Sequence, residues 1–131
     1  MNKNIELHKN GGFYSVFGES TYIFYYLFNY RIIENRVGFP ISAHDKVIAK
    51  LEELNINYID TFANITKNYK KRNRYNEFVE KGKKKYSLIY RINEINKKLE
   101  LLTEDKIDNI LNYIETIIAD EKWKIYFIKK I

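Results

Sequence analysis

The side chains best suited to a chemical task in this sequence are nine lysines and arginines gathered between residues 67 and 85. Three tyrosines are interleaved with them, and only two glutamates oppose their charge. Cations that neutralise phosphates, combined with rings that stack on bases, are typical of nucleic-acid surfaces. The alternative is a solvated helix face in a lysine-rich protein. The nine are Lys67, Lys70, Lys71, Arg72, Arg74, Lys81, Lys83, Lys84 and Lys85.

Side chains for catalysis or metal binding are sparse. Cysteine is absent, which excludes disulfides, thiolate zinc sites and cysteine nucleophiles. Neither His8 nor His44 has a carboxylate or a second histidine at a metal-ligand spacing, so both are predicted to be surface histidines. No glycine-rich phosphate loop or nucleophile elbow is present. We therefore expect a protein that is not an enzyme and has no catalytic residue, metal or cofactor.

The charge is concentrated rather than spread over the chain. Ile, Lys, Asn and Tyr make up 65 of the 131 residues, and their A/T-rich codons weaken the significance of the overall net charge of +6. Residues 1–66 have a net charge of −1, residues 67–100 of +8 and residues 101–131 of −1. The middle segment is therefore the charge feature to explain.

Composition limits the class of protein. A chain of 131 residues with 45% hydrophobic and 16% aromatic residues is long enough for one cored domain, or a small domain with an appendage, and is not of a disordered type. The first ten residues lack an apolar leader, and the longest apolar stretch, 22–28, is too short to span a membrane. We expect a cytoplasmic protein without a membrane partner.

The first 66 residues have a mixed α/β pattern. Residues 5–9 and 13–17 alternate around Asn10-Gly11-Gly12, which predicts a β-hairpin. Residues 22–28 are predicted to form a short helix, capped by Ser20 or Thr21 and ended by Asn29.

The remainder of this segment is predicted to contain two more strands and a helix. Residues 30–33 and 36–39 have strand character, and Pro40 ends it. Ser42 is the expected N-cap of a helix with an apolar face that ends at Asn55. Residues 56–62 form the last expected strand.

After residue 66 the pattern becomes helical. Apolar residues recur at spacings of three and four from about 69 to 102, which predicts one long helix or two, weakened at Gly82. Thr103 is the expected N-cap of a second helix. We expect an antiparallel helical hairpin over 67–131, with residues 123–131 either a helical turn or an edge strand. The apolar face of the second helix consists of Ile107, Ile110, Leu111, Ile114, Ile117 and Ile118.

Two segments resemble a known family. Residues 11–17, Gly-Gly-Phe-Tyr-Ser-Val-Phe, resemble the Gly-Asp-Phe-Tyr-Glu-x-Phe strand that begins the N-terminal mismatch-recognition domain (domain I) of MutS DNA mismatch repair proteins. Residues 37–51 are similar to that domain's Gly-x-Pro turn and the helix carrying Ala-Lys-Leu. The resemblance covers about residues 3–62. It implies an α+β fold of the order β-hairpin–α–β–α–β for the domain 1–66.

The resemblance also implies residue roles. The family's first phenylalanine stacks on a mispaired base, and its glutamate two residues later hydrogen-bonds that base. The stacking position falls on Phe13, with Tyr14 beside it as a second groove-probing ring, because a flat apolar ring can unstack a base step. The family's glutamate is replaced by Ser15, and its aspartate by Gly12.

Together these observations predict a small non-catalytic nucleic-acid-associated protein. It binds DNA through the basic segment and through Phe13 and Tyr14, and it forms homo-oligomers through its helices. The alternative is a protein-binding module or inhibitor of phage or mobile-element origin, for example of a host defence or repair protein. Such a module would act through its amphipathic helices or through a small-ligand pocket among the aromatic residues 24–30.

Overall fold

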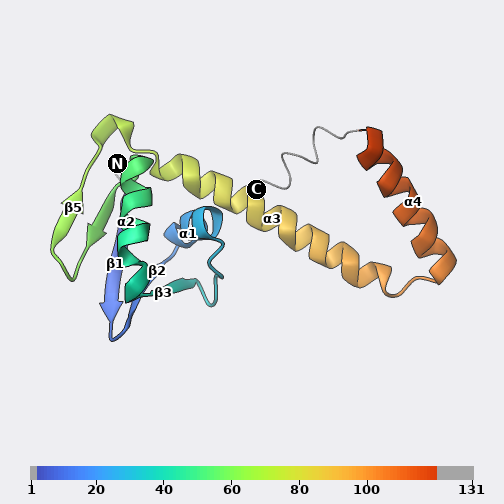
Figure 1. Cartoon of the computed structure of the whole chain (residues 1–131), viewed down its shortest axis with the longest axis horizontal. Coiled ribbons are helices and arrows are strands. Elements are labelled where there is room, and N and C mark those ends of the chain that lie inside the picture. The colour runs from blue at the N-terminus through green and yellow to red at the C-terminus, as the bar shows by residue number, and fades with distance from the viewer. Residues whose placement is uncertain (1–2, 121–131) are drawn as a thin grey trace. The chain divides into compact units, whose positions relative to one another are not determined.

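The computed structural model describes residues 3–120 (Figure 1). The chain forms two compact units, Met1–Ile89 and Tyr90–Ile131. The division lies later than the boundary expected after residue 66. Strand β5 (Ile65–Lys67) crosses the expected position and pairs with β4 (Tyr58–Asp60), which keeps this part of the chain in the first unit. The first unit is a mixed α+β fold, as predicted.

The sheet of the first unit is built around the predicted hairpin. Strands β1 (Ile5–Asn10) and β2 (Phe13–Phe17) are antiparallel, and Gly11 adopts a φ of 62° in the turn between them. Strand β3 (Arg36–Pro40) pairs antiparallel with β2, and β4 pairs parallel with β1. The resulting order is β3-β2-β1-β4-β5.

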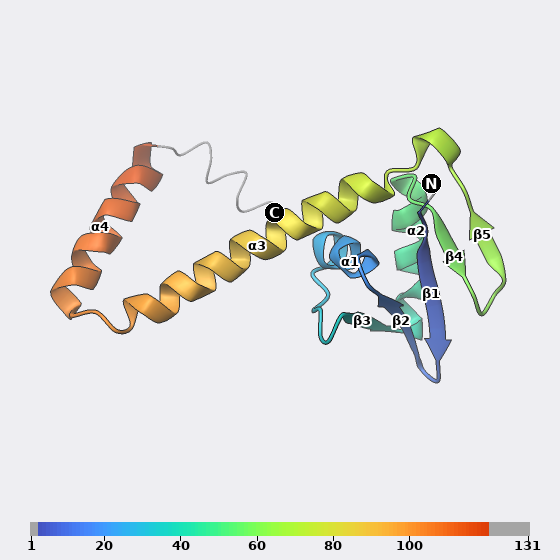
Figure 2. The ribbon, with the colours of Figure 1, turned by 180° about the vertical axis from the view of Figure 1, so that it is seen from behind.

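Two helices complete this unit on one side of the sheet. Helix α1 (Ser20–Phe28) follows β2, and helix α2 (His44–Glu53) lies between β3 and β4 in the sequence. Figure 2 shows the sheet from the other side, with α2 behind it. The elements therefore follow in the order hairpin, helix, strand, helix, strand, and β5 is added after them.

Strand alternation decides which face of the sheet is covered. Ile5 and Leu7 of β1 are fully buried, as are their neighbours on the same face in β2 and β3. The intervening residues point to the opposite face, where several side chains are exposed. The core consists of Ile5, Leu7, Tyr14, Val16, Ile23, Phe24, Val37, Phe39, Val47, Leu51, Ile56, Tyr58, Tyr75, Phe78 and Val79.

Helix α3 (Tyr75–Leu99) adds its first turns to this core. Tyr75, Phe78 and Val79 are buried, and Gly82 lies directly against α1. A Cβ atom at Gly82 would lie 2.1 Å from the carbonyl oxygen of Tyr22. The expected weak point in the helix is therefore a place of close helix–helix contact, and α3 continues through it without a break.

Several expected boundaries are wrong. Residues 30–33 are not a strand, because Glu34 and Asn35 adopt positive φ values of 50° and 62° in a tight turn that leaves only an isolated bridge between Ile33 and Arg36. Ser42 does not cap α2; it lies in a 3-10 turn, η1 (Ile41–Ala43). Ser20 is the first residue of α1 rather than its cap.

The region around the expected domain boundary also differs. The predicted strand 56–62 is reduced to the three residues of β4, and β5 was not predicted because three residues with a polar centre carry little strand pattern. Residues 69–74 do not form an α-helix. They contain the 3-10 turn η2 (Lys70–Arg72), and α3 begins only at Tyr75.

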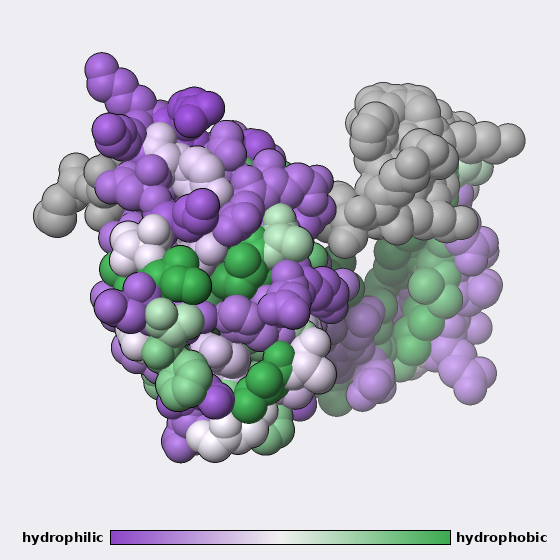
Figure 3. Space-filling view, turned by 60° about the vertical axis from the view of Figure 1, so that its left-hand side comes forward, coloured by the Kyte–Doolittle hydropathy of each residue, from purple (hydrophilic) through white to green (hydrophobic). Residues whose placement is uncertain are grey.

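The second unit contains the end of α3 and helix α4 (Glu104–Asp120). The two helices were predicted, but the packed hairpin was not found: from 90 to 119 no side chain is buried. The apolar residues of α4 are half-buried or exposed. Figure 3 shows apolar surface on this part of the chain, bordered by polar side chains. Within residues 3–120 no helix combines the length and apolar character needed to cross a bilayer. The expectation for 123–131 lies outside the described residues.

Candidate nucleic-acid interface

Two phenylalanines stand on the sheet face that α2 leaves open. Phe13 and Phe17 are 59% and 53% exposed, at the two ends of β2. Both point away from the core because they alternate with the buried Tyr14 and Val16. Exposed faces of antiparallel sheets are ordinarily polar, so two large rings in one strand are a feature that packing does not explain.

The residues around these rings leave a shallow strip. Ser15 lies between them on the same face, and its partner on β3 is Gly38, so the space between the rings is occupied by small residues. Phe13 pairs with Pro40 and Phe17 with Arg36. On the β1 side the strip is bordered by polar residues, which are Glu6, His8 and Asn10.

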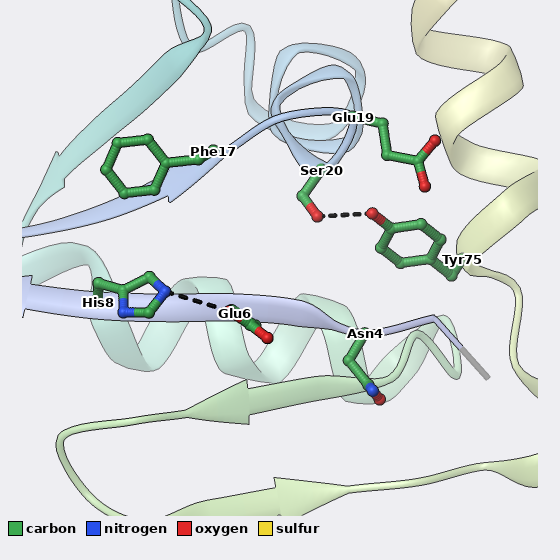
Figure 4. A pocket seen from close by; sticks show the side chains of 7 residues that line it. All are labelled: Asn4, Glu6, His8, Phe17, Glu19, Ser20 and Tyr75. Atoms are coloured by element: carbon green, nitrogen blue, oxygen red, sulfur yellow. Dashed lines mark hydrogen bonds and ion pairs between the residues drawn. The ribbon is translucent and has the colours of Figure 1, made fainter. Parts of the chain in front are cut away.

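At the Phe17 end the strip opens into a hollow of about 220 Å³ (Figure 4). The His8 and Phe17 rings lie 6.0 Å apart between centroids, and His8 Nε2 lies 3.4 Å from Glu6 Oε2. At the other side the hydroxyls of Ser20 and Tyr75 are hydrogen-bonded at 2.7 Å. Burial raises the pKa of Tyr75, so its phenol is protonated at neutral pH. The lining residues are Asn4, Glu6, His8, Phe17, Glu19, Ser20 and Tyr75.

Tyr14 is not available as a probing ring. It is only 5% exposed, and its ring stacks on Phe39 at 5.6 Å and on His44 at 4.8 Å between centroids. Burial, followed by the nearby carboxylates, raises the pKa of its phenol. The prediction that Tyr14 contacts a groove is wrong, because strand alternation turns it into the core while Phe13 faces solvent.

The predicted cations do not lie together on one surface. Within α3, Lys81 lies over the Phe78 ring at 4.8 Å and Lys85 over the Tyr25 ring at 5.0 Å. Lys85 also donates to the side chain of Asn29, and partial burial lowers its pKa. These two cations therefore pack against rings of the protein itself, where their aliphatic stems cover apolar surface.

Arg74, which directly precedes α3, and the other cations of that helix point in different directions. Arg74 donates to Glu77 at 2.7 Å, and Lys83 lies on the Tyr22 ring at 6.0 Å and beside Glu80 at 3.8 Å. At 100° per residue, Lys84 points away from the side on which Gly82 meets α1. The cations therefore do not form the single helix face expected from the sequence, because they point to several sides of α3.

The cations before α3 form the compact group. Lys70, Lys71 and Arg72 of η2 are exposed, and none makes an ion pair among residues 3–120. Their position is fixed by Asn73, which donates to the Lys3 carbonyl at the start of β1. Phe13 pairs with Asn10 at the other end of β1, so the two features are separated by roughly 20 Å of strand. The hollow at Phe17 is lined by Glu6 and His8 from the intervening strand β1.

A second cluster on the covered side of the sheet was missed by sequence reasoning. His44 Nε2 lies 2.7 Å from Asp60 Oδ2, and Asp60 is 1% exposed. The other Asp60 oxygen accepts the amides of Phe62 and Ala63 at 3.2 and 3.1 Å. The prediction of a surface His44 is therefore wrong: the side chain is 23% exposed and joins α2 to the end of β4. The pair was missed because its two members are 16 residues apart in the sequence.

Neither cluster provides a metal site within the described residues. Residues 3–120 contain no group of three or more metal-ligating side chains. Comparison with known proteins gave no match to a family model, to a curated protein or to a solved structure. Function must therefore be inferred from the geometry of this chain alone.

Proposed function

We propose that this protein binds nucleic acid without catalysing a reaction, and that Phe13 stacks on an exposed base. The observation that carries the proposal is the Phe13 ring, 59% exposed on a sheet face that no helix of the first unit covers. Stacking on an aromatic ring stabilises a bound base by about 1–3 kcal/mol. A ring so placed contributes little to folding and is ready to bind a flat partner.

The order of elements supports a MutS domain I-like reading of this unit. The hairpin, helix, strand, helix and strand occur in the order that the resemblance implies, and Phe13 is exposed as a stacking residue must be. Ser15 is buried, so it does not replace the family's glutamate in hydrogen bonding to a base. In this proposal Phe13 acts by stacking alone, and the protein does not select a particular mismatch.

The phosphate contacts are assigned to η2 rather than to α3. Lys70, Lys71 and Arg72 are exposed and unpaired within residues 3–120, whereas Lys81 and Lys85 lie on aromatic rings. Each phosphate neutralised releases counterions, so binding through η2 must weaken as salt rises.

Fluorescence anisotropy with labelled single-stranded, matched and mismatched DNA across a salt series tests this function. We expect Phe13→Ala to weaken binding about tenfold, with Phe62→Ala as the control, because Phe62 is exposed but lies in the turn after β4 beneath Lys9. A Lys70→Glu, Lys71→Glu double variant should lower the log–log salt slope by about two. Its matched control is Lys46→Glu with Lys50→Glu in α2. Absence of binding at low salt to every nucleic acid would refute the proposal.

A second function is favoured by a separate observation, the apolar faces of α3 and α4. On a helical wheel the exposed or half-buried apolar side chains cover a stripe about 120° wide on each helix. Such stripes are wider than the two-residue seam of a pair of helices and are typical of helices in a larger bundle. The stripe residues are Leu88, Ile89, Ile92, Ile95 and Leu99 in α3, and Ile107, Ile110, Leu111, Ile114, Ile117 and Ile118 in α4.

The occupant of these faces is proposed to be a second copy of the chain. Beside its stripe, over residues 86–99, helix α3 carries three basic and one acidic side chain, whereas residues 104–119 of α4 carry four acidic and one basic. The α4 of one copy therefore complements the α3 of the other, and a two-fold pair would give a four-helix bundle with each apolar stripe inside.

Light scattering coupled to size-exclusion chromatography tests this pairing over a range of protein concentrations. We expect a dimer that Ile114→Glu converts to a monomer. Because that variant also risks unfolding α4, two charge-reversed variants provide an independent test. Lys97→Glu with Lys98→Glu, and Glu104→Lys with Asp108→Lys, should each dimerise poorly alone and pair with each other when mixed. A monomer at every concentration would exclude the bundle.

A further inference from the structure

The hollow beside Phe17 is a site that the stacking function of Phe13 does not use. It lies on the same open face, with the Phe17 ring on one side and the hydrogen-bonded Ser20 and Tyr75 hydroxyls on another (Figure 4). Its volume of about 220 Å³ is sufficient for one flat heterocycle. An exposed ring beside a polar hollow is the arrangement that binds a base by stacking on its face and hydrogen bonds to its edge.

Two carboxylates line the hollow and act as hydrogen-bond acceptors. They belong to Glu6 and Glu19, and within residues 3–120 no lysine or arginine lines the hollow. Lys3 lies 2.9 Å from Glu19, whereas within the described part of the chain the basic partner of Glu6 is His8 alone. Such a lining repels a phosphate and accepts hydrogen bonds from amino groups. Carboxylates are the usual protein partners of the exocyclic amine of cytosine.

The spacing of the rings fixes how a nucleic acid reaches both. Phe13 and Phe17 are four residues apart in one strand, which places them about 13 Å from each other. A stacked strand covers this distance in about four nucleotide steps, and an extended strand needs fewer. Ser15 and Gly38 leave the space between the rings low enough for the intervening nucleotides to pass.

We propose that the open face binds a single-stranded nucleic acid, with one base on Phe13 and an amino-bearing base in the hollow at Phe17. This rests on the proposed function and adds the class of nucleic acid and a base preference. Bases paired in a duplex do not present their faces to two separate rings, whereas unpaired bases do. Thymine and uracil place carbonyl oxygens where cytosine and adenine place amines, so the carboxylate of Glu6 disfavours them.

The test compares binding of labelled dC10, dA10 and dT10 by fluorescence anisotropy at fixed salt. We expect dC10 and dA10 to bind at least fivefold more tightly than dT10. Phe17→Ala should weaken dC10 binding about tenfold, and Phe62→Ala is the matched control. Glu6→Gln supplies both an acceptor and a donor, so it should reduce the preference for dC10 over dT10 to less than twofold. Circular dichroism of each variant shows whether the fold is retained.

The outcomes separate this inference from the function on which it rests. Absence of binding to any nucleic acid refutes both. Binding that requires Phe13 but is unchanged in Phe17→Ala and equal for dC10 and dT10 overturns the inference alone. Tighter binding to a mismatched duplex than to dC10 also overturns it. A labelled arginine-containing peptide that binds the hollow and is released by Glu6→Gln would assign the acidic lining to a protein ligand instead.

Discussion

The two units of this chain differ in where their apolar side chains lie. In the first unit fifteen hydrophobic residues are buried in one cluster that joins the sheet, α1, α2 and the first turns of α3. In the second, the apolar residues of the helices remain half-buried or exposed. Hydrophobic burial is the dominant favourable contribution to folding, so the first unit is stabilised from within.

Helix α3 runs through both units, and its two ends differ in burial. Helix α3 begins with buried Tyr75, Phe78 and Val79 and ends with exposed Ile92 and Ile95. Most of the stability of a helix in a protein comes from the packing of its apolar face rather than from intrinsic propensity. We therefore expect the second unit to need a partner surface, which the second copy proposed above would supply.

The most severe test of the first unit is Gly82→Ala. Alanine ordinarily stabilises a helix interior relative to glycine by up to about 1 kcal/mol. Here the new methyl group would lie 2.1 Å from the backbone carbonyl oxygen of Tyr22, which forces α3 and α1 apart. We expect the free energy of unfolding to fall by about 3 kcal/mol, measured by chemical denaturation.

The control for this change is Ser87→Ala, at an exposed position of the same helix. It should be neutral or stabilise the protein by a few tenths of a kcal/mol, as helix propensity predicts. Equal effects of the two substitutions would mean that α3 does not pack closely on α1.

The next largest effect is expected at the His44–Asp60 pair. Asp60→Asn replaces a buried carboxylate that holds His44 and two backbone amides, and His44→Ala leaves that carboxylate without its side-chain partner. Removing one member of a buried polar pair costs its desolvation without compensation. We expect each variant to lose about 2 kcal/mol of unfolding free energy.

A double-mutant cycle measures the pair itself. If His44 and Asp60 act together, the combined variant should lose less than the sum of the single variants. His8→Ala is the comparison, because His8 lies on the open face beside the exposed Glu6 and should change stability by less than about 0.5 kcal/mol.

Local signals were sufficient for part of this fold. The Asn10-Gly11-Gly12 turn between two alternating segments predicted the hairpin, and the uniform spacing of apolar residues predicted the helices. Features that depend on distant contacts were not accessible. The contact of Gly82 with α1 and the His44–Asp60 pair both join residues that lie far apart in the sequence. Strand β5 was missed for another reason, since its three residues with a polar centre carry little strand pattern.

The candidate site shows the same limit. Strand alternation exposes Phe13 and buries Tyr14. The sequence alone does not show which of two alternating sets of side chains faces the helices. The hollow was missed because Tyr75 of α3 and Glu6 of β1 are 69 positions apart. The cations are evident from the sequence, but their grouping in space depends on the end of β5 and the turn η2.

A smaller effect is expected from removing the second unit. A chain ended after Ile89 retains every residue of the core cluster. We expect its unfolding transition by circular dichroism to stay within about 1 kcal/mol of that of the full chain, because the helix residues removed are not buried within the described chain. A loss of more than 3 kcal/mol would mean that the second unit stabilises the first.

The smallest effects on stability are expected from Phe13→Ser and Phe17→Ser, although both rings are assigned to binding. Both side chains are more than half exposed, so their removal sacrifices little buried area, and we expect changes in unfolding free energy within about 0.5 kcal/mol. Phe39→Ser, on the covered face of the same sheet, should cost several kcal/mol. A phenylalanine that stability does not require is available for contact with a molecule outside the fold. Loss of nucleic-acid affinity at unchanged stability therefore separates a binding face from a packed one within a single sheet.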